Sequence, residues 1–113
     1  MAIEPELEPK IDPKIATLLG FARKSKSLAL GELAVEQSIK KGQAKLVILA
    51  EDVSAKKKTI IEKWCHDKDI YYLALSDKET YARVFNTRPQ GFISVSDIQI
   101  AKSIWNRNSA GGD

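Results

Sequence analysis

The sequence predicts an α/β domain, a three-layer α-β-α sandwich whose middle layer is a mixed, partly parallel four-stranded sheet. Segments with apolar residues at helical spacing alternate with short apolar runs of strand length along the chain. Because the connections between them are short, this alternation indicates a sheet with helices on both faces. The run Ala44–Ala50, AKLVILA, is almost continuously apolar, which is typical of a strand that is covered on both faces.

The first part of the chain predicts a helix, a strand and a second helix. The Asp12 side chain can accept a hydrogen bond from a free amide of the first helical turn, and Pro13 loses no hydrogen bond in that turn. A helix should therefore begin here and run to about Ser25. The short apolar stretch Ser27–Leu30 indicates a strand. A second helix is expected over residues 31–41, and the glycine at the next position provides its stop.

The alternation continues after the central strand. We expect a helix capped by Ser54 and running to about Asp67, a strand at Ile70–Leu75, a helix at Asp77–Phe85, a strand at Phe92–Ser96 and a final helix at Asp97–Trp105.

Length and charge indicate one basic domain with polar ends. The 113 residues suit a single core, which we place at residues 12–105, between a mobile acidic, proline-rich arm (1–11) and a flexible tail (106–113). The net charge of +3 divides unevenly, because residues 1–13 carry −3 and the other hundred carry +6. A basic body favours polyanionic partners by long-range attraction.

The composition also excludes several classes of protein. Cys65 is the only cysteine, so no internal disulfide forms and a reducing, cytoplasmic setting is expected. No run of about 18 apolar residues suits a membrane span. The acidic start of the chain differs from a secretion signal, which is basic and then apolar.

The residues that could support catalysis are few. Glu51 and Asp52 follow the apolar strand and could serve acid–base chemistry or hold Mg²⁺, but neighbouring residues leave a strand in different directions. Cys65 and His66 lie about 100° apart on a helix, so they form no catalytic pair, and one Cys with one His cannot make a usual zinc site. Glycine-rich phosphate loops are absent from the sequence. We therefore expect no enzyme activity, cofactor or metal.

The second helix and the turn before it offer a binding site. With Val35, Ser38 and Ile39 toward the core, Leu33 is exposed in the first turn, on the same face as Gln37 and Lys40. The first amides of this helix are free donors, which suit a phosphate or a base edge. Basic residues precede them at Arg23, Lys24 and Lys26. The alternative is a plain amphipathic helix with one exposed leucine, and the residues alone leave both open.

The segment Gly31–Ser54, GELAVEQSIKKGQAKLVILAEDVS, resembles the seven-Ae family of large-subunit ribosomal proteins, which includes the thirty-e protein and bacterial paralogues of both. The run Lys40–Asp52 is similar to the family signature, and Phe21–Glu32 is similar to the bacterial branch. The order and spacing of elements agree from about residue 15 to 105. The resemblance implies an α-β-α sandwich that binds kink-turn RNA, a helix–bulge–helix element with tandem sheared G·A pairs.

In this family the second helix enters the RNA through a pattern G-x-N-E-x-x-K, and a loop before the last strand closes on the extruded base. Gly31 matches the glycine, whereas Leu33, Ala34 and Gln37 stand at the Asn, Glu and Lys positions. Leu and Ala side chains cannot hydrogen-bond to base edges, and each lost contact removes about 1–3 kcal/mol of discrimination. The implied RNA-binding residues are Lys26, Gly31, Glu32, Leu33, Ala34, Gln37, Lys40, Asn86, Thr87, Arg88 and Gln90. They suit recognition of RNA shape with little base readout.

Two functional hypotheses follow. The preferred one is a non-enzymatic protein of translation or the ribosome that binds structured, kink-turn-type RNA, ribosomal RNA included, and has no membrane partner. The alternative is a protein-interaction module on the same fold, in which Leu33 and Ala34 form an apolar docking spot and the acidic arm contacts a protein partner.

Overall fold

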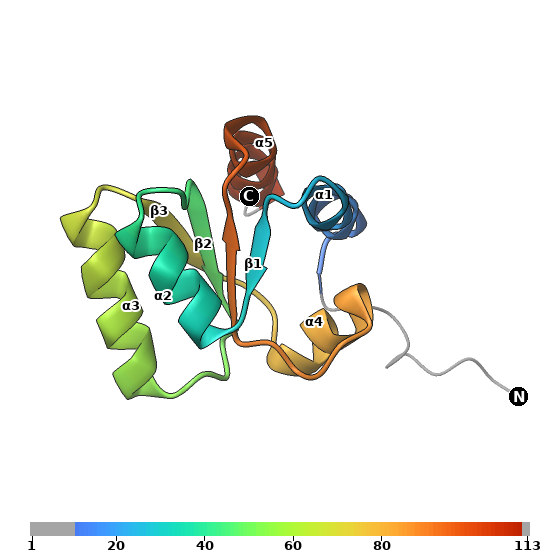
Figure 1. Cartoon of the computed structure of the whole chain (residues 1–113). Helices are drawn as coiled ribbons and strands as arrows, with labels where there is room; N and C mark the ends of the chain where they lie inside the picture. Colours follow the sequence, from blue (N-terminus) through green and yellow to red (C-terminus); the bar gives the residue numbers. More distant parts are fainter. Residues whose placement is uncertain (1–10, 112–113) are drawn as a thin grey trace, which may run out of the picture.

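The computed structural model describes residues 11–111, which form five helices and one four-stranded sheet (Figure 1). The elements are α1 (Pro13–Lys24), β1 (Leu28–Leu30), α2 (Glu32–Lys40), β2 (Leu46–Leu49), α3 (Ala55–Asp67), β3 (Tyr71–Ala74), α4 (Lys78–Phe85), β4 (Phe92–Val95) and α5 (Ile98–Gly111). Each predicted helix and strand is present in the predicted order.

Side-chain caps explain where most of the helices begin. The oxygens of Asp12, Ser54, Asp77 and Asp97 accept hydrogen bonds from first-turn amides at 2.8–3.2 Å, at the starts of α1, α3, α4 and α5. Such caps satisfy donors that would otherwise have no partner. By contrast, α2 begins at Gly31 without any side-chain cap.

The strand order is β1-β4-β2-β3. β2 and β3 run parallel, whereas β4 is antiparallel to both of its neighbours, so the predicted mixed sheet is confirmed. β4 therefore lies in the interior of the sheet although it is the last strand in the sequence. β1 and β3 form the two edges.

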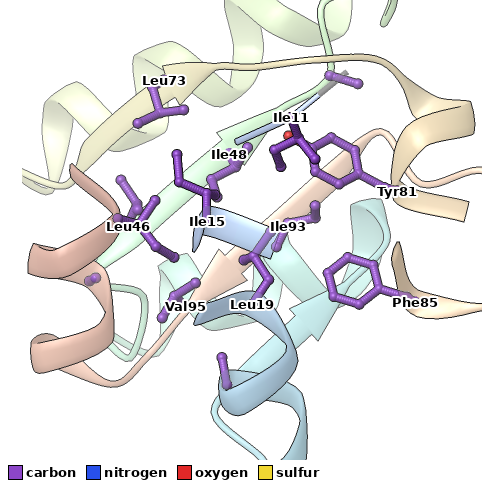
Figure 2. Packing of buried hydrophobic residues seen from close by; sticks show 14 residues of the cluster. Ile11, Ile15, Leu19, Leu46, Ile48, Leu73, Tyr81, Phe85, Ile93 and Val95 are labelled. Atoms are coloured by element: carbon purple, nitrogen blue, oxygen red, sulfur yellow. The ribbon is translucent and has the colours of Figure 1, made fainter. Parts of the chain in front are cut away.

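Helices cover both faces of the sheet, which confirms the three layers (Figure 1). Leu46 and Ile48 of β2 pack toward α1, α4 and α5, and Figure 2 shows them among the other side chains of this cluster. Val47 and Leu49 point the other way and pack against α2 and α3. All four side chains are buried, as expected for the continuously apolar run.

Tyr81 of α4 is the largest fully buried side chain, and it lies in the cluster shown in Figure 2. Its hydroxyl donates a hydrogen bond of 2.6 Å to the carbonyl oxygen of Leu75. Burial raises the pKa of the Tyr81 phenol well above its usual range, and the negative charges of Glu51 and Asp77 add to this effect. The phenol is therefore held neutral inside the domain.

The boundaries of the domain differ from the expected ones. α5 continues through Gly111, past the expected end at Trp105 and into the segment predicted to be a flexible tail. Arg107 donates from its Nε to Asp12 at 2.6 Å, which connects α5 to the start of α1 and lowers the pKa of the Asp12 carboxyl. Ile11, assigned to the acidic arm, is buried in the core. The rest of that arm, residues 1–10, lies outside the described residues.

Candidate functional site

The start of α2 presents free hydrogen-bond donors. The amide of Gly31 donates to the carbonyl of Phe92 at 2.9 Å, and Val35 makes the first bond of the helix, back to the Gly31 carbonyl at 3.0 Å. Between them, the amides of residues 32–34 find no acceptor within residues 11–111. Gly31 has φ 98° and ψ 159°, a conformation that is essentially restricted to glycine.

The loop between α4 and β4 lies beside this turn. A Cβ added to Gly31 would lie 4.0 Å from Oε1 of Gln90. Gln90 donates through Nε2 to Oγ1 of Thr87 at 3.3 Å, which orders the loop internally. Asn86 ends α4 in the left-handed conformation with φ 55°, and Arg88 is exposed. The two predicted segments are thus neighbours in space.

The outer face of α2 is arranged as expected. Val35, Ser38 and Ile39 are buried, and 67% of the Leu33 surface is exposed. Glu32 is turned toward α3, where its carboxylate accepts from Nζ of Lys57 at 2.7 Å. This ion pair positions Glu32 beside the free amides and satisfies its charge within the protein.

A polar pocket of about 180 Å³ extends the site along α2 toward β1 and β4. Lys26, Ala34 and Gln37 line it, together with Lys41. Lys41 was not among the predicted residues, although it follows Gln37 by four positions and so shares its helix face. Beneath, the buried hydroxyl of Ser94 has no hydrogen-bond partner among residues 11–111.

Two of the predicted basic side chains are engaged elsewhere. Lys40 pairs with Glu36 at 2.8 Å, and its Nζ lies 5.5 Å from the ring centroid of Trp64 on α3. It therefore does not join Lys26 at the polar pocket. Arg23 donates to the carbonyl of Phe85 and lies over that residue's ring, so it connects α1 to the end of α4.

Asp52 and Cys65, two of the residues considered for catalysis, have structural roles. Asp52 accepts from the amide of Lys78 at 3.1 Å, at the start of α4. Cys65 is fully buried, and burial, with a contribution from Glu62, raises the pKa of its thiol to about 11, so the thiol is protonated at neutral pH. His66 is exposed.

The described part of the chain contains neither a cluster of metal ligands nor a helix that could cross a membrane. Across residues 11–111, no three His, Cys, Asp or Glu side chains gather as a metal site would need. None of the helices in the same range combines the length and the apolar character that crossing a membrane requires.

Comparisons with known proteins were made by sequence and by structure. Residues 13–103 match the model of the Ribosomal protein L7Ae/L30e/S12e/Gadd45 family. A protein of unknown function from Bacillus halodurans is 24% identical, with a TM-score of 0.79, over 84% of this chain and 96% of that one. The 15.5kD RNA binding protein of Giardia lamblia is 19% identical, with a TM-score of 0.73, over 96% of this chain and 98% of that one. These two likenesses establish a shared fold, and a search of curated proteins found no match.

Proposed function

The chain belongs to the ribosomal protein L7Ae/L30e/S12e/Gadd45 family, and from this premise we propose that it binds structured RNA of the kink-turn type, without catalysis, in translation or at the ribosome. The observation that carries the proposal is the uncapped start of α2, where three amides without an acceptor within residues 11–111 lie beside the loop at 86–90. The RNA-binding character of the Giardia neighbour supports the same assignment.

The chemistry of the site fits an RNA backbone. Free amides and the helix dipole attract phosphate, and Gly31 has no side chain to hold a backbone away. Lys26 and Lys41 add positive charge beside the polar pocket. The side chains of Leu33 and Ala34 offer no hydrogen bond to a base, so in this proposal the protein recognises the bent shape of the RNA and reads few bases.

A direct test compares a kink-turn duplex with the same duplex lacking its bulge. We expect tighter binding to the kink-turn, and affinity for both should fall linearly on a plot of log K against log salt, because bound phosphates release counterions. Equal affinity for the two duplexes at every salt concentration would exclude kink-turn recognition.

A gain-of-function variant tests which residues face the RNA. Leu33→Asn combined with Ala34→Glu and Gln37→Lys restores side chains that can contact bases, and each such contact discriminates by about 1–3 kcal/mol. The triple variant should therefore bind the kink-turn at least tenfold more tightly, as measured by fluorescence anisotropy. The added Glu and Lys cancel, so the triple variant keeps the parent's net charge, and Gln99→Lys, which adds one positive charge on the exposed side of α5, is the control for general electrostatic attraction. An unchanged affinity in the triple variant would show that these positions do not face RNA.

The exposure of Leu33 favours one alternative, a protein-interaction module on the same fold. An apolar side chain that is two-thirds exposed in a first turn is suited to docking into a partner. Leu33→Ser separates the two functions. Loss of a co-purifying protein with unchanged RNA affinity would favour the module, whereas weaker RNA binding alone would favour the RNA interface.

A further inference from the structure

An aromatic pair made of one exposed and one partly buried ring lies on a part of the surface that the proposed RNA site does not use. Tyr71 at the start of β3 and Trp105 on α5 stack with their ring centroids 4.6 Å apart and their planes 15° apart. Tyr71 keeps 63% of its surface exposed despite this contact. A large aromatic ring that is held flat and left open to solvent is a ready surface for stacking.

The pair borders a cavity of about 360 Å³, a size typical of ligand sites. Ile98 and Ala101 of α5 form its apolar part, together with the two rings. Lys45, Lys102 and Asn106 complete the lining. A second hollow of about 400 Å³ shares Lys45, Tyr71 and Ile98 and continues to Lys68 and Asp69.

The fold explains why this apolar surface is left open. Ile98, Ala101 and Trp105 occupy positions i, i+3 and i+7, so they share one face of α5. That face lies beside β3, a strand of four residues at the edge of the sheet. No element of the described part of the chain therefore covers the whole apolar face of α5, and Ile98 remains 47% exposed.

The charged side chains that line the cavity itself have one sign, whereas the adjoining hollow also contains Asp69. Lys45 and Lys102 contact no acidic side chain within residues 11–111, and the lining of the cavity contains no carboxylate. Asp97, at the start of α5, is occupied in capping that helix. The surface thus combines a planar apolar platform with two lysines that form no ion pair with any side chain of the described residues.

We propose that Tyr71 and Trp105 form a stacking platform for an unpaired base of single-stranded RNA, whose flanking phosphates are neutralised by Lys45 and Lys102. A base can stack its flat ring on the aromatic pair, and its phosphates carry the negative charge that complements the two lysines. A protein segment would need an acidic side chain opposite each lysine. The inference rests on the proposed function only in taking RNA as the ligand.

The position of the platform makes it a second contact. The amide of Gly31 bonds to Phe92 at one end of β4, whereas the amide of Lys45 bonds to Val95 at the other end, about 10 Å away along the strand. In addition, α2 packs on the opposite face of the sheet from Ala101 and Trp105, so a kink-turn bound at α2 would leave the platform free for a single-stranded extension of the same RNA.

The fluorescence of Trp105 can report directly whether a base stacks on the pair. In a Trp64→Phe background Trp105 is the only tryptophan, and a base that stacks on the pair should quench its fluorescence. Titration with a short oligoadenylate RNA should show this quenching. Tyr71→Leu, which keeps an apolar side chain but removes the ring, should weaken binding roughly 5- to 150-fold, whereas Tyr71→Phe should bind like the parent.

Controls separate stacking from general effects. Phe21→Leu removes another exposed ring, on α1, and should leave oligoadenylate affinity unchanged. Lys45→Gln and Lys102→Gln should each reduce the slope of log K against log salt by about 0.7, the value for one phosphate of a single strand. Circular dichroism of each variant checks that the fold is kept.

Several outcomes would overturn the platform. One is Trp105 fluorescence that oligoadenylate does not quench, and another is a Tyr71→Leu variant that binds oligoadenylate as well as the parent does. The third is a dimer, detected by light scattering, that the Tyr71→Leu substitution dissociates, since a second copy of the chain would then cover the pair. Binding of a blunt kink-turn duplex should be unaffected by Tyr71→Leu. If that duplex fails to bind while oligoadenylate binding depends on Tyr71, the site at α2 fails and the platform stands.

Discussion

Replacing Gly31 with alanine tests the geometry on which the site at α2 depends. The added Cβ would meet no atom closer than Oε1 of Gln90, at 4.0 Å, so there is no clash to relieve. The cost arises from the backbone alone, because a φ of 98° with a ψ of 159° is accessible only to glycine, and holding another residue there costs about 1–3 kcal/mol.

Gly20 provides the matched control. It lies inside α1, where an added Cβ has no atom within 4 Å and φ is in the usual helical range. Gly20→Ala should stabilise the protein by about 0.4–1 kcal/mol, because alanine restricts the unfolded chain and favours a helix. The same chemical change is thus expected to have opposite signs at the two positions.

Urea unfolding measures both variants. The midpoint should fall for Gly31→Ala and rise for Gly20→Ala, with an unchanged m-value, and each kcal/mol should move the thermal midpoint by at least about 4 °C. A Gly31→Ala variant as stable as the parent would show that the turn before α2 does not have the described conformation. The reasoning about the free amides would then fail with it.

Three further predictions concern the rest of the domain. The pKa of Tyr81 is raised in the folded state, so the stability that its neutral phenol contributes is complete below the ordinary pKa of 10.0 and is lost as the pH rises beyond that value. The Tyr81→Phe variant has no phenol to ionise. Its free energy of unfolding, measured in urea, should therefore fall less in alkali than that of the parent. The pKa of Asp12 is lowered by Arg107, so the stability that this pair contributes is present above the ordinary pKa of 3.8 and is lost as the pH falls. In the Arg107→Gln variant, an NMR titration should show the pKa of Asp12 returning toward 3.8. The free energy of unfolding of this variant should also depend less on pH in acid. Ile48→Ala should cost about 2–5 kcal/mol in urea unfolding because the side chain is fully buried, whereas Leu33→Ala should stay within about 0.5 kcal/mol, and equal losses would contradict the assigned burial.

The sequence carries most of the local information about this fold. Asp12 and Ser54 cap helices where their chemistry predicts, because a cap depends only on residues in the first turn. Ala44–Ala50 contains a strand buried on both faces, since continuous apolar character needs cover on both sides. The exposed position of Leu33 also follows from helical periodicity alone.

What the sequence does not reveal depends on contacts between distant residues. The polar residues after Trp105 read as a tail, but Arg107 pairs with Asp12, 95 positions earlier, and α5 continues. The stacking of Tyr71 on Trp105 likewise depends on which strand forms the edge of the sheet. No local pattern sets that order, because β4 enters between β1 and β2 only through long-range pairing.

The interior position of β4 has a consequence for synthesis of the protein. Until Phe92–Val95 has emerged from the ribosome, β1 has no strand beside it and β2 has only β3 as a partner. A nascent chain that stops short of β4 would expose unpaired strand edges, which attract other chains. Folding of this domain should therefore be a late, all-or-none event, which begins once β4 can pair with β1 and β2.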